Sequence, residues 1–399
     1  MRGWIRAWGQ AGLVASMAWA AAASANDHPW ADHTASASPL SSVTRADARL
    51  YALCGVPDNG LVRVASSLVA RQLAGQPPPE SARLGERLRM EGLPYMWPRV
   101  WMLAGPADPE EVRRRMERWQ MADRRKVPLR CGVARGQTPQ GGQVVVAVQS
   151  DVLADLGALP TKARRGQWLK LDAQMRVAAT QAKVMLLPPR GRPRRVLTSL
   201  SPGGRVRSRF AVDQAGRWLV QVVATTATGP TPVIEAPIFV GVPPHPANLR
   251  QLSAPPAGAS DDGAIFGWLN EVRKREKLPP LSRDPALDRL ASAHSAHMIR
   301  SGRVAHQLGD GNAADRAHRA GLFFTTIGEN VARAATPQRA HLALHGSPSH
   351  RATMLIADLE HVGLAAVRGP AGRLWVTQIF AGRVSRPRAR ALDVRRKRR

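Results

Sequence analysis

Residues 269–298 read LNEVRKREKLPPLSRDPALDRLASAHSAHM, and the spacing of their apolar side chains decides the fold of the last part of this 399-residue chain. From residue 265 to residue 278, apolar side chains recur three and four positions apart, as on one face of a helix: Ile265, Trp268, Leu269 and Val272. After a Pro-Pro break the same spacing returns at Leu287, Leu290, Ala291, His294 and Met298. We therefore predict two amphipathic helices on either side of the break.

Histidine is concentrated in the same part of the chain. Eight of the eleven His residues lie between His294 and His361. Composition alone does not explain such clustering, so we expect a functional site here. His294 shares the apolar stripe of its helix and is predicted to be a buried core residue. His341 and His345 lie four apart, but no Glu follows His341 as an H-E-x-x-H zinc motif requires, so a solvated helix face is expected.

Further short motifs follow in a fixed order: VAHQLGD, DRAHRAGL, IGENVA, SPSHRATML, HVGLAAV and LWVTQIFAG. With the opening stretch, this order resembles the bacterial SCP-like branch of the CAP superfamily, which groups cysteine-rich secretory proteins, antigen 5 and pathogenesis-related 1. The resemblance covers residues 265–382. It implies an α-β-α sandwich, in which helices flank a small and mostly antiparallel sheet, and it implies secretion.

Members of this superfamily build a surface cleft from two His and two acidic residues. The resemblance places the first His at His306, the first acid at Glu329 and the second His at His350. The second acid has no counterpart in AHLALHGS, the segment before SPSH. The chain also has Leu344 where bacterial members commonly have Trp, and Ser349 where they have Gly. The expected cleft is therefore reduced to three residues.

The turn that carries His350 reads LHGSPSH from residue 344 to residue 350. Gly346 suits the C′ position of one helix. Ser347 suits the N-cap of the next helix, with its hydroxyl engaged by backbone amides, and Pro348 suits N1. His350 is then N3, where the positive end of the helix dipole disfavours a second positive charge. We expect a neutral imidazole that can bind metal, accept a proton or hydrogen-bond a ligand.

These residues define the candidate site. The catalytic candidates are His306, Glu329 and His350; His306 and His350 are the candidate metal ligands, with zinc as the expected ion; and Asn330, Ser347 and His345 are candidate binding residues. The alternatives are structural, since Glu329 and Asn330 can brace a loop and His350 can be a plain capping-turn residue. Because the hydroxyl of Ser347 is expected to be engaged as an N-cap, a serine hydrolase is not favoured.

The formal net charge of +29 points to anionic partners such as acidic polysaccharide, lipopolysaccharide or anionic lipid. The alternative is compositional, with Arg standing where another protein would use Lys. No aromatic residues alternate with the basic ones, and no RNP-like motif occurs, so we expect no specific nucleic-acid partner.

The N-terminus has the pattern of an export signal. Arg2 and Arg6 precede an apolar, Ala-rich run that ends in Ala23-Ser24-Ala25. The run is short for a membrane span, so we expect no transmembrane anchor and an exported protein that is periplasmic, outer-surface or extracellular. In such a compartment Cys54 and Cys131, the two cysteines of the chain, can close a disulfide.

The pattern along the chain predicts a multidomain α+β protein. We expect a signal peptide (1–25), a linker (26–44), a helical domain (45–150), an immunoglobulin-like β-sandwich (160–243), a linker (244–263), a CAP domain (264–383) and a basic tail (384–399). The sandwich is predicted from short β-rich runs with Pro and Gly turns between them. Within it, residues 210–222 resemble a strand pair of bacterial immunoglobulin-like modules, with a turn at 213–216.

The N-terminal helical domain resembles the CAP region in the order of its motifs. Residues 61–73 (LVRVASSLVARQL) align with residues 287–299 (LDRLASAHSAHMI), and an Asp lies three residues before each, at Asp58 and Asp284. Self-similarity in one order favours duplication. We therefore predict a degenerate CAP copy in which the position of Glu329 falls near Val100 and that of His350 near Arg125. Chance similarity among Ala- and Arg-rich helices is the alternative.

Three functions follow from these patterns. The first is binding of a lipid, glycan or protein partner at the cell envelope through the reduced His/Glu cleft. The second is a metal-assisted or acid-base hydrolase that uses His306, Glu329 and His350. The third is a non-catalytic scaffold or adhesin, in which these residues have no chemical role.

Overall fold

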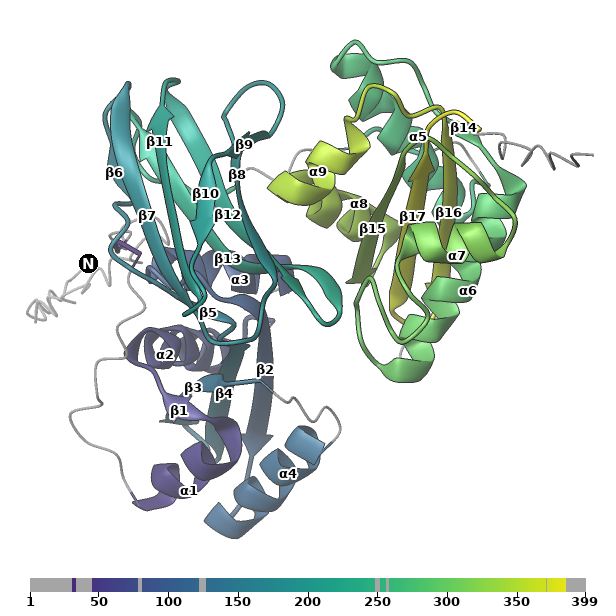
Figure 1. Cartoon of the computed structure of the whole chain (residues 1–399). Helices are drawn as coiled ribbons and strands as arrows, with labels where there is room; N and C mark the ends of the chain where they lie inside the picture. The colour runs from purple at the N-terminus through teal and green to yellow at the C-terminus, as the bar shows by residue number, and fades with distance from the viewer. Residues whose placement is uncertain are drawn as a thin grey trace, which may run out of the picture.

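The computed structural model of the chain describes residues 31–33, 45–77, 81–121, 127–247, 252–255, 258–370 and 372–384. Figure 1 shows three units in chain order: an N-terminal unit of helices and strands, a central unit of strands, and a C-terminal unit of helices around a sheet. The predicted signal peptide and nearly all of the basic tail lie outside the described residues, as do parts of both linkers.

The C-terminal unit is a four-stranded sheet between helices. Its strand order is β14-β16-β17-β15, and all pairs are antiparallel except β14 with β16. The elements are α5 (Asp261–Arg275), β14 (Ser282–Arg283), α6 (Pro285–Ser301), α7 (Ala313–Arg319), β15 (Ile327–Ala334), α8 (Pro337–Gly346), α9 (Pro348–Met354), β16 (His361–Arg368) and β17 (Leu374–Ala381).

Two cores lie on the two faces of this sheet. On one face α6 packs through Leu287 and Ala291 against Ile379 of β17. On the other face α5 and α8 pack through residues such as Trp268 and Leu344. Both amphipathic helices predicted from the opening stretch therefore exist, and they lie in different layers of a helix–sheet–helix arrangement.

The start and end of α6 follow from local chemistry. The side chain of Asp284 accepts hydrogen bonds from the amides of Ala286 and Leu287 as the N-cap, and Pro285 occupies N1. The helix ends at Gly302, whose φ of 67° is the left-handed conformation that glycine adopts at low cost. This end turns the chain back toward the sheet and so positions the loop that carries His306.

The central unit has two sheets around one core. The orders are β10-β11-β7-β5 and β6-β13-β12-β8-β9, and buried residues of both sheets, such as Leu171 and Val220, share one cluster. The strands are β5 (Ala154–Leu156), β6 (Lys162–Ala163), β7 (Gln167–Met175), β8 (Gln181–Leu187), β9 (Arg194–Val196), β10 (Thr198–Leu200), β11 (Arg205–Val212), β12 (Gly216–Thr226) and β13 (Gly229–Val240).

One detail of the predicted sandwich is wrong. The turn at residues 213–216 does connect two strands, β11 and β12, but these strands do not pair with each other. β11 pairs with β7 and β10, whereas β12 pairs with β8 and β13. Alternation of apolar residues shows which side of a strand is buried but does not identify the neighbouring strand.

The N-terminal unit is less helical than its sequence pattern indicated. It contains α1 (Arg45–Cys54), β1 (Val56–Pro57), α2 (Asn59–Leu73), α3 (Ser81–Met90), β2 (Met96–Gly105), α4 (Pro109–Met121), β3 (Leu129–Gln137) and β4 (Gln143–Asp151). Strand β2 lies within the stretch that was predicted to be helical. Cys54 and Cys131 form a disulfide that joins α1 to β3, with a Cα–Cα distance of 5.7 Å.

The sheets of the N-terminal and C-terminal units have the same strand order. The N-terminal order is β1-β3-β4-β2, with β1 parallel to β3, and the C-terminal order is β14-β16-β17-β15, with β14 parallel to β16. Helix α2, which follows β1, and helix α6, which follows β14, both start after an Asp N-cap, Asp58 and Asp284. A glycine lies in the strand that each of these helices crosses. Gly132 of β3 faces α2, and Gly363 of β16 faces α6.

Helices long and apolar enough to cross a membrane are absent from the part of the chain that the structure describes.

Gly363 and Gly132 test how tightly these helices pack. A Cβ at Gly363 would lie 2.1 Å from the carbonyl carbon of Leu287, and one at Gly132 would lie 2.0 Å from that of Leu61. Backbone cannot move aside easily, so Gly363→Ala and Gly132→Ala should each destabilise the chain by about 2 kcal/mol in urea unfolding. Gly267→Ala is the control, because Gly267 is exposed within α5 with open space around it, and Ala there should stabilise the helix by up to about 1 kcal/mol. Unchanged stability of both tight-site variants would contradict this packing.

Candidate functional site

Glu329 is the centre of the site. It lies on β15, where it pairs in register with Ile379 of β17, and its side chain is only 5% exposed. One carboxylate oxygen accepts a hydrogen bond from Nδ1 of His306 at 2.8 Å, and the other accepts one from Nη2 of Arg316. Two of the three predicted site residues are therefore in direct contact, and an arginine accompanies them.

The charge of Glu329 is stabilised by these partners. Burial alone raises the pKa of a carboxyl group, but the hydrogen bond from His306 and the positive charges of His306 and Arg316 hold the pKa of Glu329 below its usual value. The carboxylate stays ionised at neutral pH. Each of its oxygens accepts a hydrogen bond, so Glu329 holds His306 and Arg316 in place.

Arg316 also fixes the loop that carries His306. Its Nη1 donates to the carbonyl oxygen of His306 at 3.1 Å and to that of Gly311 at 2.8 Å. It extends from α7, a short helix that starts with a capping box between Asn312 and Asp315. Arg316 is thus a positioning residue of the site, and sequence analysis missed it because nothing separated it from the other 57 Lys and Arg residues.

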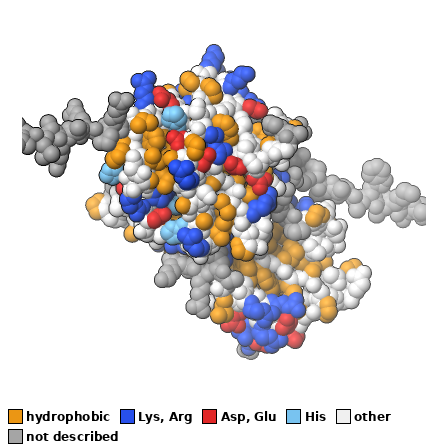
Figure 2. Space-filling model, turned by 90° about the vertical axis from the view of Figure 1, so that its right-hand side faces the viewer, with side chains coloured by type: hydrophobic (Ala, Val, Ile, Leu, Met, Phe, Trp, Pro, Cys, Tyr) orange, Lys and Arg blue, Asp and Glu red, His pale blue; other side chains and the backbone are white. Residues whose placement is uncertain are grey.

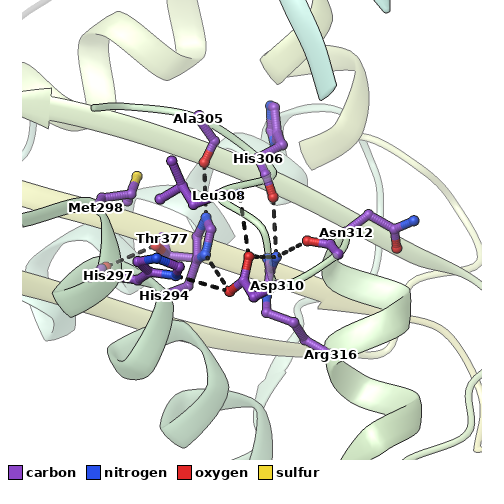
Figure 3. A network of polar contacts seen from close by, with 12 residues as sticks. His294, His297, Met298, Ala305, His306, Leu308, Asp310, Asn312, Arg316 and Thr377 are labelled. Atoms are coloured by element: carbon purple, nitrogen blue, oxygen red, sulfur yellow. Dashed lines mark hydrogen bonds and ion pairs between the residues drawn. The ribbon is translucent and has the colours of Figure 1, made fainter. Parts of the chain in front are cut away.

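A second acid lies beside this group. Asp310 Oδ2 is 3.3 Å from Nδ1 of His297 and 3.7 Å from Nδ1 of His294, and Figure 3 shows both rings turned toward it. His294 is buried, with Nε2 2.9 Å from the carbonyl oxygen of Ala305, as expected for a core histidine. Asp310 belongs to the VAHQLGD motif. Sequence analysis sought the second acid only in the segment before the SPSH turn and therefore missed Asp310.

His350 is the second predicted imidazole, at the N3 position of α9. Burial, together with the positive charge of His306, lowers the pKa of His350 to about 3. The imidazole is therefore neutral, as predicted, but burial rather than the helix dipole is the main cause. Asn330, the neighbour of Glu329 in β15, bonds the carbonyl oxygen of His350, so the start of α9 lies beside the strand that carries Glu329.

Asn330 and His345, two of the predicted binding residues, contact other groups of the CAP domain. Asn330 is fully buried, and its Nδ2 donates to the carbonyl oxygen of His350 at 3.1 Å and to Gln378 Oε1 at 3.2 Å. His345 stacks on His341, and His341 packs on Trp268. His341 is buried, so the predicted solvated face is wrong at this residue.

Two predictions about the SPSH turn are wrong. Gly346 is the last residue of α8 and has no positive φ, so it is not a left-handed C′ residue. Ser347 is the N-cap of α9, but its hydroxyl makes no cap hydrogen bond. Instead it accepts one from Nε2 of Gln221, a residue of the central unit, at 3.1 Å. Sequence analysis of the turn alone could not anticipate a partner 126 positions away.

The central unit covers the site. Gln221, which donates to Ser347, also accepts a hydrogen bond from the amide of Ser349 at 3.0 Å. The side chain of Gln221 is fully buried. At the other end of strand β12, the carbonyl oxygen of Thr228 accepts a hydrogen bond from the amide of Gln307 at 3.1 Å. Next to it, a Cβ added at Gly229 would lie 2.9 Å from the Cβ of His306. Contacts thus reach the flanks of both His306 and His350.

The cover is tied to the N-terminal unit as well. Gln221 Nε2 donates to Glu235 Oε1 at 2.7 Å, and Glu235 Oε2 accepts a hydrogen bond from Arg89 of α3. Arg217 of β12 also pairs with Glu86 of α3 at 3.2 Å. A polar network therefore runs from α3 through the central unit to the SPSH turn.

The donor set suits a metal poorly. With its Nδ1 bonded to Glu329, His306 has only Nε2 left as a ligand atom, an arrangement that resembles a second-shell carboxylate holding a zinc ligand. However, both oxygens of Glu329 already accept hydrogen bonds, and a catalytic zinc site uses three protein ligands. No group of three or more His, Cys, Asp or Glu that could hold a metal ion occurs among the described residues.

Comparison with known proteins identifies the C-terminal unit. Residues 267–380 match the family described as CAP: Cysteine-rich secretory protein family. The Bacillus subtilis (strain 168) protein YkwD is 30% identical over 133 residues, which are 33% of this chain and 51% of that protein. The chain thus spans about half the length of this curated relative. The predicted CAP domain is confirmed.

Solved structures are similar to parts of the chain. An outer surface protein from Borrelia burgdorferi is 21% identical and covers 30% of this chain and 90% of its own, with a TM-score of 0.29. An extracellular protein containing an SCP domain from Bacillus anthracis is 16% identical and covers 58% of this chain and 86% of its own, with a TM-score of 0.28.

The depressed pKa of His350 predicts how stability depends on pH. Between the unfolded pKa near 6.5 and the folded value of about 3, the unfolded chain binds a proton at this residue and the folded chain does not. Its contribution to stability is thus present above pH 6.5 and is lost as the pH falls. In urea unfolding from pH 6 to pH 4, His350→Gln should lose less stability than the parent chain, by about 1.4 kcal/mol for each pH unit. Parallel curves would contradict a neutral, buried His350.

The cover predicts slow chemical modification of the site. Diethyl pyrocarbonate should modify His306 and His350 slowly relative to the exposed His318 of the same chain. Gln221→Ala removes the contacts to Ser347 and Ser349, and at about 1–3 kcal/mol for lost buried hydrogen bonds it should speed modification of both by tenfold or more. Gln174→Ala, a hydrogen-bonded glutamine of β7, is the control and should change nothing. Fast modification of the parent chain would show that the site is open.

Proposed function

Because residues 267–380 form a CAP domain, we propose that this is an exported protein that binds a partner at the cell envelope or outside the cell. We propose His306, Glu329 and His350 as the binding site, and a lipid, a glycan or a protein as the partner. Export is supported by the Arg2 and Arg6 pattern at the N-terminus, and the similar protein from Bacillus anthracis is described as extracellular.

One observation favours binding over catalysis. Both oxygens of Glu329 accept hydrogen bonds, one from His306 and one from Arg316, and its pKa is held below the usual value. A general base must reach the proton that it removes and needs a pKa near the working pH. Glu329 is nearly buried, is bonded at both oxygens and has a lowered pKa, so it is poorly suited to that role. A neutral His350 beside it can still hydrogen-bond a ligand.

The hydrolase alternative has one observation in its favour. Glu329 accepts from Nδ1 of His306 and so orients the imidazole with Nε2 free, as the carboxylate does in a catalytic triad. Against it, the hydroxyl of Ser347, the serine considered as a nucleophile, is bonded to Gln221. The scaffold alternative is supported by the cover, since a site held beneath another domain can serve to join the two domains.

Zinc remains a prediction. If an ion binds, His306 Nε2 and His350 would supply two imidazole ligands and water the remainder, and a bound zinc would act there as a Lewis acid.

We also propose that the N-terminal unit is a degenerate copy of the CAP fold. The register supports it: Glu329 pairs with Ile379, which pairs with Gly363, and Val100 pairs with Val148, which pairs with Gly132. Taking Gly132 and Gly363 as counterparts, this register aligns Val100 with Glu329, which supports the sequence alignment. Arg125 lies outside the described residues. We likewise propose that the two-sheet central unit is an immunoglobulin-like spacer.

Figure 2 bears on the partner. On the face that it shows, most Lys and Arg side chains are mixed with Asp, Glu and apolar side chains, and a cluster of Lys and Arg at the bottom of the view is bordered by Asp and Glu. A mixed surface of this kind agrees with the compositional reading of the high Arg content on that face. The net charge alone therefore does not identify the partner, and anionic envelope components remain a proposal.

One experiment separates the three functions. The parent chain, His306→Ala/His350→Ala and the control His318→Ala/His361→Ala would be compared for zinc content, for turnover of reporter peptides and esters, and for capture of radiolabelled envelope lipids and glycans. We expect no turnover, and at least tenfold weaker capture by the site variant alone. Turnover that the site variant lacks would replace binding with hydrolysis. Equal capture by the three proteins, without turnover, would leave only the scaffold function. Stoichiometric zinc in the parent chain that is lost in the site variant would establish the metal.

A further inference from the structure

The outward face of strands β7 and β11 in the central unit is basic. Along β11, buried and exposed residues alternate, with Val206, Ser208 and Phe210 turned inward. The exposed positions between them are all cationic: Arg205, Arg207 and Arg209. On the neighbouring strand β7, the outward positions are Trp168, Lys170, Asp172 and Gln174. Four cations therefore share this face with a single carboxylate.

That carboxylate is already used. Asp172 forms a two-oxygen pair with Nε of Arg205, at 2.8 and 3.1 Å, and lies 3.9 Å from Nε of Arg207. Lys170 and Arg209 stand directly opposite each other in the strand register. Among the described residues, no carboxylate lies within ion-pair distance of either one.

Two like charges directly opposite on neighbouring strands destabilise a sheet. Cations beside strand edges also keep sheets from pairing with each other. β10 pairs with β11 only at residues 206–208, and β5 pairs with β7 only at residues 173–175. The Lys170–Arg209 pair therefore lies where the sheet is two strands wide, and each cation repels the other.

Large apolar side chains flank these cations. Trp168 is 64% exposed, and the guanidinium of Arg209 lies 5.8 Å from the centre of its ring. Leu197 is 92% exposed and lies two residues before Ser199, which pairs with Arg207, so strand alternation places it on the same side of the sheet as Arg207 and Arg209. In Figure 1 this sheet is on the side of the central unit away from the C-terminal unit, so neither the CAP domain nor its site competes for it.

We propose that this face, defined by Trp168, Lys170, Leu197, Arg207 and Arg209, docks on an anionic phospholipid surface. Lipid phosphates relieve the repulsion between Lys170 and Arg209. Tryptophan suits the boundary between headgroups and acyl chains, and an exposed leucine suits the apolar layer beneath it. The docking depends on neither the CAP site nor its ligand.

Other polyanions fit the face less well. A single strand of nucleic acid stacks its bases on several aromatic residues along a groove, and this face is flat with one Trp. An acidic polysaccharide would use the cations and Trp168, but it gives no role to Leu197, the most exposed large apolar side chain of the described chain. Cations together with two exposed apolar groups are the combination that an anionic membrane surface attracts.

Lys170→Glu tests the proposal because its two effects have opposite signs. It turns a like-charge pair into an opposite-charge pair, so the chain should melt at a higher temperature. It should also weaken co-sedimentation of the full chain with phosphatidylglycerol–phosphatidylcholine vesicles about 30-fold, the effect of two elementary charges at about 1 kcal/mol each. Binding should be absent with phosphatidylcholine alone and should weaken as salt is added.

Arg190→Glu is the matched control. Arg190 is exposed in the β8–β9 turn of the same unit, and its reversal changes net charge equally. It should bind vesicles as the parent does. Trp168→Ser/Leu197→Ser keeps the charge and should weaken binding as well. Equal loss in Lys170→Glu and Arg190→Glu would overturn the proposal in favour of net charge. Binding to an acidic polysaccharide but not to vesicles would overturn the choice of lipid.

Discussion

The ion-paired cluster of Glu329 depends on one constraint: a buried carboxylate needs partners. At 5% exposure, Glu329 is ionised only because His306 and Arg316 each bond one of its oxygens. The same two partners anchor the loop after α6, since Arg316 also bonds the backbone of His306 and Gly311. Strand β15, helix α7 and the histidine loop are thus held together by a charge cluster, and this cluster determines which atoms of the site remain available to a ligand.

The three units are connected by polar contacts that end at the site. Glu235 receives hydrogen bonds from Arg89 on one side and from Gln221 on the other, and Gln221 continues to Ser347 and Ser349. A buried network of this kind is costly when half satisfied, so it favours one arrangement of the units. Gln221 thereby joins the central unit to the turn that carries His350.

Sequence analysis was most successful where the signal is local and periodic. The two amphipathic helices and the contact of His306 with Glu329 follow from spacing and motif order. The neutral state of His350 was also expected, although its main cause is burial. Sequence analysis failed where the partner is distant in sequence. The hydroxyl of Ser347 bonds to Gln221 rather than to its own helix, Arg316 could not be singled out, and strand β2 was masked by the helical pattern around it. These errors arise because tertiary contacts override local propensity.

The ionisation of Glu329 can be measured directly by ¹³C NMR of the chain labelled at its glutamate carboxyl carbons, with Glu329→Gln used to assign the signal. Paired with His306 and Arg316, Glu329 should give a signal that titrates below the usual range of glutamate, near 4.3, and the other glutamate signals should be unaffected by the substitution. A Glu329 signal that titrates above that range would mean a protonated or free carboxyl group. The charge cluster would then be wrong, and the acid-base hydrolase would become the better account.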